Sequence, residues 1–219
     1  MTELVALLGH PVAHSLSPRM QNAAFAARAL DWTYVAIDVE PARLAEALSG
    51  LDALGFAGAN VTAPHKTAVA KLVGSELPSV NTLVRGRGYS TDAAILAGLP
   101  TERPVVIGDG GAAAAFVHAL PHARVFSRRT EWPPEAGDAD LVVNATPVRD
   151  EVLVELREGQ ALVDLPYPRS ATASAAAAAG ARVLDGLEVL VAQGAASFEL
   201  WTGVEAPVPV MRRALGLDA

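Results

Sequence analysis

The sequence predicts an α/β protein with two domains, and three observations carry that prediction. Apolar runs that suit β-strands alternate with alanine-rich stretches that suit helices along the chain. A second series of such units begins at "PVVIGDGG", where a buried type of strand runs directly into glycines and then a helix. With 219 residues, 51% of them hydrophobic, the chain is long enough to bury one large core or two smaller ones. Mostly parallel sheets are therefore expected.

The first half of the chain supplies the elements of the first domain. Each expected strand is a short apolar run bounded by turn residues, and the helices lie between these runs. Strands are expected at 4–9, 32–39 and 55–62, helices near 18–30 and 41–50, and two short strands around a Gly-rich turn within 81–92.

The second half predicts a small doubly wound domain of the Rossmann type. After the glycine-flanked strand and its helix, strands are expected at 123–127, 140–146, 161–167 and 181–186. Residues 170–180 are low in complexity but rich in alanine, which favours a crossover helix that ends at Gly180. Residues 130–138 are short and proline-rich, so one helix of this domain is predicted to be reduced or missing.

Composition excludes several classes of function. The chain has 17 Lys and Arg against 24 Asp and Glu, a net charge of −7, and no basic cluster, which argues against a nucleic-acid partner. Cysteine is absent, which excludes thiolate chemistry and is compatible with the predicted cytoplasmic location. Residues 1–9 resemble a first strand and not a signal peptide, and no apolar run approaches the length of a membrane span. No metal site is predicted, because the histidines follow no ligand pattern.

The segment "GDGGAA" predicts a nucleotide site. It supplies Gly108, Gly110 and Ala113 in the pattern G-x-G-x-x-A between a strand and a helix. Glycines there allow a tight turn and close backbone approach to a pyrophosphate, whose charge the helix N-terminus stabilises. Asp109 adds a negative charge within this loop, which opposes tight binding. The plainer alternative is an ordinary strand-to-helix turn.

The next strand end indicates which dinucleotide the site prefers. Ser127 lies 19 residues after Gly108, about where an NAD site carries an acidic residue for the ribose. The sequence there reads "SRRT", and guanidinium groups suit a 2′-phosphate. NADP is therefore predicted over NAD, unless Arg128 and Arg129 are merely solvated loop charges.

Two further segments place polar residues beside helix or strand ends. In "HSLSPRM", Ser17 is predicted as a helix N-cap with Pro18 at the first helical position, and Ser15 lies beside it. A carboxylate is favoured at such a helix end. In "GANVTAPHK", Lys66 lies just beyond a predicted strand end, where it is either a solvated surface charge or a site residue.

Together these segments resemble the shikimate dehydrogenase family. "HSLSP", "ANVTAPHK", "VNTLV", "STD", "GDGGA", "NATP" and "GLEVLVAQGAASFELWTG" occur in that family's order over nearly the whole chain. The resemblance implies NADPH-dependent reduction of 3-dehydroshikimate to shikimate, in the pathway to aromatic amino acids. It also implies a substrate domain of residues 1–97 completed by helices in 187–219, and an NADP domain of residues 98–186.

The resemblance also implies roles for individual residues. Lys66 and Asp92 would be the catalytic pair. The substrate would contact Ser15 and Ser17 through its carboxylate, Thr62, Asn81 and Gln193 through its ring hydroxyls, and Tyr167 nearby. NADP would be held by Gly108, Gly110, Gly111, Ala112, Arg128, Arg129, Thr130 and the turn of Asn144, Thr146 and Pro147.

The chemistry of Lys66 is consistent with that role. Hydride delivery to a ketone creates an alkoxide, which needs a proton donor or cation within hydrogen-bond reach, and a lysine beside an aspartate can serve.

The chain is nevertheless short for the family, and its intervals before Asn81 and Gly108 look contracted. Two alternatives are therefore kept: an NAD-using quinate/shikimate dehydrogenase, and a non-catalytic ligand-binding paralogue. The protein is expected to be a monomer or homodimer, and Trp132 and Trp201 are expected to be packing residues.

Overall fold

The structure, a computed structural model, describes residues 1–218, which form two compact units. The first unit contains Met1–Thr91 and the chain from Val191 onward, and the second contains Asp92–Leu190. The second unit thus begins six residues before, and ends four residues after, the boundaries drawn from the sequence. It is larger because the 3₁₀ helix η2 (Asp92–Leu96) packs against the first helix of this unit and Val189 joins its core. Ala219, the last residue of the expected substrate domain, lies outside the described residues.

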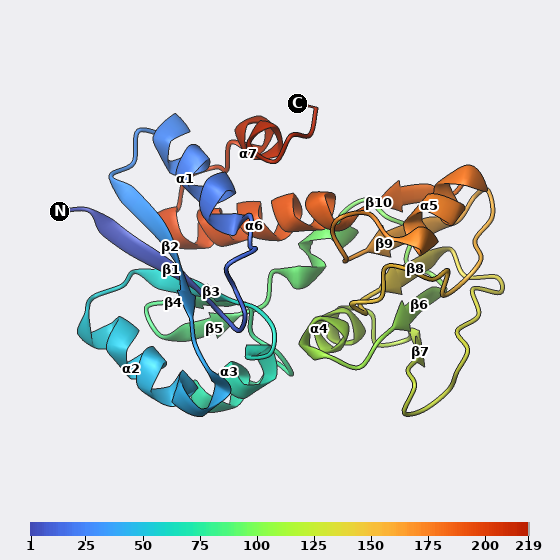
Figure 1. The fold of residues 1–219 in the computed structure, drawn as a ribbon, viewed down its shortest axis with the longest axis horizontal. Coiled ribbons are helices and arrows are strands. Elements are labelled where there is room, and N and C mark those ends of the chain that lie inside the picture. The colour runs from blue at the N-terminus through green and yellow to red at the C-terminus, as the bar shows by residue number, and fades with distance from the viewer. Residues whose placement is uncertain (219) are drawn as a thin grey trace. The chain divides into compact units, whose positions relative to one another are not determined.

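The first unit is built on a five-stranded sheet of order β2-β1-β3-β4-β5 (Figure 1). β1 pairs in parallel with β2 and β3, whereas β4 pairs antiparallel with both β3 and β5. Its elements are β1 (Glu3–Gly9), α1 (Ser17–Ala27), β2 (Trp32–Asp38), the 3₁₀ helix η1 (Pro41–Arg43), α2 (Leu44–Ala53), β3 (Gly58–Val61), α3 (Lys66–Leu72), β4 (Thr82–Val84), β5 (Arg87–Tyr89), the later part of α6 (Gly186–Thr202) and α7 (Val208–Ala214).

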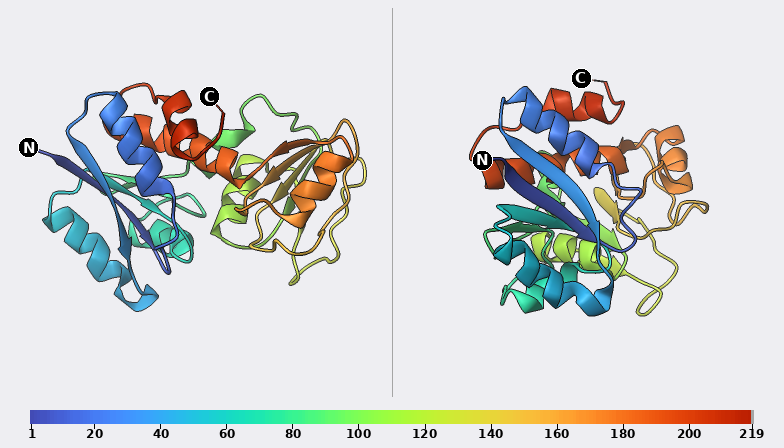
Figure 2. Two further views of the ribbon diagram at one scale, coloured as in Figure 1. Left: turned by 45° about the horizontal axis from the view of Figure 1, so that its top comes forward. Right: turned by 60° about the vertical axis from the view of Figure 1, so that its left-hand side comes forward.

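Helices cover both faces of this sheet, so its central strand is apolar throughout (Figures 1 and 2). Four consecutive residues of β1, Val5 to Leu8, are buried, as expected for a strand with no solvated face. On one face α2 and α3 pack over a cluster that includes Leu8 and Val69. On the other face Phe25 of α1 stacks on Phe198 of α6, with ring centroids 5.3 Å apart. The helix α3 was not predicted, because "KTAVAKL" is short.

The second unit is a parallel sheet of order β10-β9-β8-β6-β7, which confirms the predicted doubly wound arrangement. Its elements after η2 are β6 (Pro104–Ile107), α4 (Gly111–Ala119), β7 (Arg124–Phe126), β8 (Leu141–Asn144), β9 (Ala161–Asp164), α5 (Ala171–Ala178), β10 (Arg182–Leu184) and the start of α6. Ser170 caps α5 by accepting a hydrogen bond from the N–H of Ala173 at 3.0 Å.

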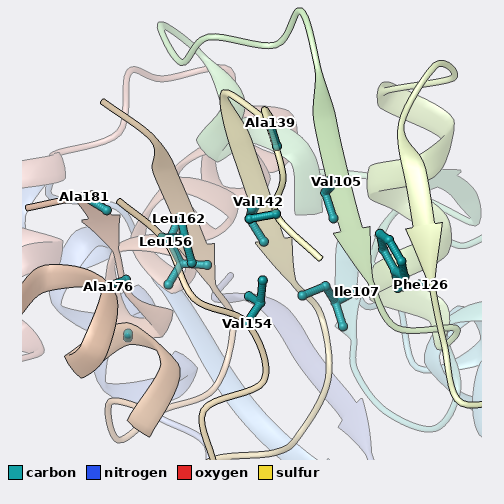
Figure 3. Close-up of a cluster of buried hydrophobic side chains, with 12 residues drawn as sticks. Val105, Ile107, Phe126, Ala139, Val142, Val154, Leu156, Leu162, Ala176 and Ala181 are labelled. Carbon is teal, nitrogen blue, oxygen red and sulfur yellow. The ribbon is translucent and has the colours of Figure 1, made fainter. Parts of the chain in front are cut away.

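The two faces of this sheet are covered differently. Val106 and Val143 pack with α4 and Val189, whereas the alternate residues Val105 and Val142 pack on the other face. On that second face, α5 is joined by side chains from irregular segments, as Figure 3 shows for Val154 and Leu156. Residues 127–140 contain no helix, which confirms the predicted reduction, and neither do residues 145–160. Irregular chain therefore takes the place of two crossover helices.

Within residues 1–218, none of the helices combines the length and the apolar character that crossing a bilayer would need.

Candidate active site

The predicted substrate residues of the first unit gather where the order of strands reverses. β1 comes first in the chain, β2 lies on one side of it and β3 on the other. The loops that follow β1 and β3 therefore leave the sheet side by side, and the N–H of His10 donates to the carbonyl of Ala63 at 3.1 Å. Ligands of open α/β sheets bind at such points, outside the carboxyl ends of the strands. Ser15 and Ser17 follow β1, and Thr62 and Lys66 follow β3.

The serine loop differs in detail from the prediction. Leu16 is the N-cap of α1 and Ser17 is its first residue, so the prediction that Ser17 caps this helix is wrong. Instead Ser15 Oγ accepts from the backbone N–H of Ser17 at 3.2 Å. Pro18 stands at the second helical position, where its missing N–H is tolerated because the first N–H groups of a helix have no partner within it. Ser17 is buried and Ser15 is half-buried, so both hydroxyls lie at the helix N-terminus.

Asp38, at the end of β2, anchors the loop that carries these serines. One carboxylate oxygen lies 2.6 Å from Nδ1 of His10, and the other accepts from the N–H of Val12 at 3.1 Å. The hydrogen bond with His10 and that with Val12 hold the pKa of Asp38 below its ordinary value. Sequence reasoning missed Asp38, which lies 23 residues from Ser15.

Lys66 is the first residue of α3 and is partly buried. The N-cap before it is His65, whose side chain is only 1% exposed and whose Nε2 lies 2.7 Å from the carbonyl oxygen of Val39. The carbonyl of Lys66 accepts from the N–H of Val80 at 3.1 Å. The backbone of Lys66 is therefore fixed on both sides, and Thr62 lies half-buried one turn earlier.

Asn81 is the most constrained of the predicted substrate residues. Its side chain is 2% exposed, its Oδ1 accepts from the N–H of Thr91 at 2.7 Å, and its Nδ2 donates to Thr91 Oγ1 at 2.9 Å. Gln193 Oε1 lies 3.5 Å from the same Nδ2, which brings α6 to this point. Asp92 directly follows Thr91 and is 6% exposed. The loop before the predicted catalytic aspartate is thus tied to Asn81.

A buried polar network beneath these residues was missed by the sequence reasoning. Nδ2 of Asn60 lies within 3.1 Å of Thr82 Oγ1 and 2.9 Å of Ser197 Oγ, and Oδ1 of Asn60 accepts from the hydroxyl of Tyr34 at 2.9 Å. Ser197 Oγ also lies 3.1 Å from Thr91 Oγ1. An asparagine inside the buried strand "GANV" was the available signal, because a buried amide requires partners.

The glycine loop of the second unit needs glycine at its first position. Gly108 has φ of +130°, and a Cβ atom there would lie 3.1 Å from the carbonyl oxygen of Ala145. Gly110 is the N-cap of α4, so the free N–H groups of its first turn begin at Gly111 and Ala112. Free backbone N–H groups at a helix N-terminus suit the negative charge of a pyrophosphate.

A cavity of about 310 Å³ lies at the strand-order reversal between β6 and β8. It is lined by Gly108, Asp109, Ser127, Arg128, Arg129, Trp132, Thr146, Pro147 and Val148. Of the predicted cofactor residues, the structure therefore gathers Gly108, both arginines and Thr146 around one cavity. A second cavity of about 390 Å³, beside α2 in the first unit, contains none of the predicted site residues.

Both arginines of this cavity are exposed and lie beside carboxylates. Arg129 Nε lies 3.4 Å from Asp109 Oδ2, and Arg128 Nη2 lies 3.2 Å from Glu151 Oε1. The guanidinium of Arg128 also lies 5.4 Å from the ring centroid of Trp132.

Trp132 is 38% exposed, so the expectation that it is a packing residue is wrong, whereas Trp201 is buried and donates to the carbonyl of Leu83. Trp132 is exposed because no helix forms after β7.

Asn144 takes a different position from the one its predicted role suggests. Its side chain is fully buried, with Oδ1 accepting from Thr146 Oγ1 at 2.8 Å. Asn144 therefore stabilises the "NATP" turn from the protein interior, while Thr146 lines the cavity. Thr130 is exposed and its Oγ1 lies 3.0 Å from Ser127 Oγ. Tyr167 is half-buried in the loop after β9.

Comparisons with known proteins agree on one family. The profile of the shikimate dehydrogenase substrate binding domain matches residues 7–82, and that of the shikimate 5′-dehydrogenase C-terminal domain matches residues 186–215. The chain is 41% identical to the shikimate dehydrogenase (NADP(+)) of Moorella thermoacetica, covering 98% of this chain and 92% of that one. That alignment extends over 273 residues, more than the 219 of this chain, so the relative has segments that this chain lacks.

Solved structures give the same result. The shikimate 5-dehydrogenase of Thermus thermophilus, in complex with NADP(H) and shikimate, is 32% identical with a TM-score of 0.84, covering 97% of this chain and 98% of that one. A quinate dehydrogenase from Corynebacterium glutamicum, in complex with NAD, is 25% identical with a TM-score of 0.79, covering 98% of each chain.

Proposed function

Since this chain belongs to the shikimate dehydrogenase family, we propose that it catalyses the NADPH-dependent, reversible reduction of 3-dehydroshikimate to shikimate. The observation that carries the proposal is the cavity at the β6/β8 reversal, where Gly108 and two arginines converge. A second strand-order reversal, in the first unit, supports the proposal, because the loops that carry Ser15, Ser17 and Thr62 follow its strands. Bound NADPH would supply the hydride, and the residues of this chain bind, orient and protonate.

The first unit is proposed to hold the substrate. The hydroxyls of Ser15 and Ser17 lie at the N-terminus of α1, where a carboxylate is stabilised by the helix dipole. Thr62, Asn81 and Gln193 can hydrogen-bond ring hydroxyls. Because Asn81 is fixed by Thr91 and lies close to Gln193, it presents its amide in one orientation. Tyr167, half-buried in the loop after β9, is proposed as a further substrate residue from the family resemblance alone.

Lys66 and Asp92 are proposed as the catalytic pair. In the reducing direction, the ammonium of Lys66 donates a proton to the alkoxide oxygen that forms as hydride arrives at the carbonyl carbon. Asp92, a nearly buried carboxylate, would orient and stabilise that ammonium. The fixed backbone around Lys66 supports this role, since a proton donor must be held within hydrogen-bond distance.

NADP is proposed as the preferred cofactor because two exposed guanidinium groups line the cavity after β7. A 2′-phosphate would replace the weak contacts with Asp109 and Glu151 by charge-assisted bonds. Arg129→Ala should raise the Kd of NADP roughly tenfold or more while changing the Kd of NAD less than about twofold. Equal losses for the two cofactors would assign Arg129 to the shared part of the dinucleotide.

The direct test is the initial rate of nicotinamide reduction by purified protein. Shikimate and quinate are each run with NADP and with NAD, and the pair of shikimate with NADP should be fastest. A preference for quinate with NAD would favour the alternative quinate dehydrogenase. Absence of turnover with every pair, with shikimate binding retained, would favour a non-catalytic paralogue.

Lys66→Ala tests the catalytic role directly. The proton donor is lost, so kcat should fall about 10²-fold or more while shikimate affinity stays within roughly tenfold. Lys71→Ala, in the last turn of the same helix, is the matched control and should leave kcat unchanged. A Lys66→Ala enzyme of near wild-type rate would remove Lys66 from the mechanism. A cytoplasmic location and a monomeric or homodimeric state stay predictions.

A further inference from the structure

Asp164 is a buried carboxylate at the carboxyl end of β9 to which the proposed reaction gives no role. Its side chain is 0% exposed, and its partner in the parallel register with β8 is Asn144. Asn144 Nδ2 donates to Asp164 Oδ1 at 2.7 Å. The other oxygen, Oδ2, is also buried, and the hydroxyl and backbone N–H of Ser170 lie close to the carboxylate. Burying a carboxyl group is unfavourable, so this placement calls for a reason.

The contact with Asp164 decides which way the amide of Asn144 points. An amide offers two donors on nitrogen and an acceptor on oxygen, and the two ends have nearly the same shape. Because Asp164 Oδ1 accepts from the nitrogen, the oxygen of Asn144 faces the turn after β8. There it accepts from the N–H of Thr146 at 3.1 Å and from Thr146 Oγ1 at 2.8 Å. A reversed amide would direct its own hydrogens at the backbone N–H of Thr146, which needs an acceptor.

The turn held in this way forms one wall of the nucleotide cavity. Thr146 Oγ1 accepts from the N–H of Val148 at 3.3 Å, so the hydrogen bonds run from Asp164 to the cavity lining. The turn also meets the glycine loop directly, because the carbonyl oxygen of Ala145 lies 3.1 Å from where a Cβ on Gly108 would be. A shift of residues 145–148 would therefore change both the wall of the cavity and the space available beside Gly108.

We propose that Asp164 is a positioning residue for the nicotinamide cofactor, which acts by fixing the amide of Asn144 and through it the turn of residues 145–148. The inference rests on the proposed function, because it takes the cavity to be the NADP site. Burial raises the pKa of Asp164, against the hydrogen bonds from Asn144 and from the hydroxyl and backbone N–H of Ser170, which lower it. Oδ1 is able to accept from Asn144 in either protonation state, so the role does not require the charge.

Two substitutions separate positioning from charge. Asp164→Asn keeps an oxygen acceptor of the same shape, whereas Asp164→Ala removes it and leaves the buried amide nitrogen of Asn144 without this acceptor. We expect Asp164→Ala to weaken NADP binding about tenfold, measured by titration calorimetry, and Asp164→Asn to stay within about threefold of wild type. The KM of shikimate should change less than about twofold in both. If Asp164→Ala does not fold, Asp164→Val, which fills the space without an acceptor, should give the same loss.

The order of the turn of residues 145–148 can be measured without the cofactor, from the hydrogen-exchange rates of its backbone amides. The amide of Thr146, which donates to Asn144 Oδ1, should exchange about tenfold faster in Asp164→Ala, whereas the amide of Val143 inside β8 should be unchanged. Rescue by Asp164→Asn is expected, because the amide of Asn144 is again oriented. A merely structural loss of stability would accelerate both amides together.

Asp140→Ala is the matched control, since Asp140 is a carboxylate at the opposite end of β8. It accepts from the N–H groups of Glu102 and Arg103 at 2.8 and 3.0 Å. Its loss should lower stability without changing the Kd of NADP. The proposal is overturned if Asp164→Ala keeps wild-type affinity and Thr146 exchange, or if Asp140→Ala weakens NADP binding equally. Wild-type protein that fails to bind NADP would refute the proposed function, and the Thr146 exchange would still decide the positioning role.

Discussion

Both units place their candidate sites at a reversal of strand order, but the residues around the two sites differ in kind and in burial. In each, the first strand has its second strand on one side and a later strand on the other, and the site residues follow the reversal. In the first unit these residues rest on buried side chains, among them Asn60, Asn81 and Ser197. In the second unit the cavity is lined by glycine backbone and by exposed arginines.

Because of this difference, substitutions in the two units should have different effects on stability and on ligand affinity. A buried polar network is coupled, so removing one member leaves several partners unsatisfied and alters stability together with geometry. Exposed charges around a backbone cradle are nearly independent of the core, so replacing them should alter affinity and leave stability almost unchanged.

Asn60→Ala should be the most damaging change. Its amide contacts Thr82 and Ser197 and accepts from Tyr34, and all of these groups are buried. We expect a loss of about 3 kcal/mol in the free energy of unfolding, measured with urea, because several buried groups lose partners. Tyr34→Phe removes only one of these bonds and should cost about 1 kcal/mol. Equal losses in the two variants would show that the contacts of Asn60 with Thr82 and Ser197 add nothing to the bond from Tyr34.

Gly108→Ala should disturb the second unit through its backbone. Alanine at φ of +130° is strained, and its Cβ would press on the carbonyl of Ala145, so a loss of about 2 kcal/mol is expected with weaker NADP binding. The control is Gly110→Ala, where φ is −82° and a Cβ meets nothing within 4 Å. That variant should lose about 0.5 kcal/mol, as expected for an N-cap glycine. Thermal unfolding of both variants gives the comparison.

Asp164 should make stability depend on pH in the direction opposite to a paired carboxylate. Burial raises its pKa in the folded state, and the charge of Asp185 adds to that shift, so the folded protein binds the proton more tightly than the unfolded chain. This contribution is complete below the unfolded pKa and is lost as pH rises through the folded pKa. The Tm of Asp164→Asn relative to wild type should therefore rise from about pH 4 to about pH 7. A constant difference would contradict the raised pKa.

Asp109→Asn should produce the smallest change. Asp109 and Arg129 are 46% and 83% exposed, so their contact contributes little to stability. The substitution removes a negative charge beside the proposed phosphate site, and NADP affinity should rise about threefold at low salt. The gain should shrink as ionic strength increases. An unchanged Tm with unchanged affinity at every salt concentration would show that Asp109 does not face the cofactor.

Most of the fold could be predicted from local sequence, because the pattern that defines a strand or a helix lies within a few residues. The apolar runs around β1, β6 and β8 predicted these strands, and the proline-rich stretch at 130–138 predicted that one crossover helix is reduced or missing. The family motifs led to the glycine loop and to the residues after β1 and β3. The helix start at Ser17 was not predictable in this way, because the N-cap position is occupied by Leu16, whose side chain cannot cap a helix.

What the sequence by itself determined is the order of strands and helices, the glycine loop and the types of the candidate site residues, since these follow from short-range pattern. Only the tertiary structure decided which polar side chains share a partner. Asp38 meets His10 across 28 residues, Asn60 meets Ser197 across 137, and Asn144 meets Asp164 across 20. Such pairs depend on strand register and on packing between distant segments. No repeating pattern in the sequence marks the two partners of a buried hydrogen bond, so local sequence does not predict them.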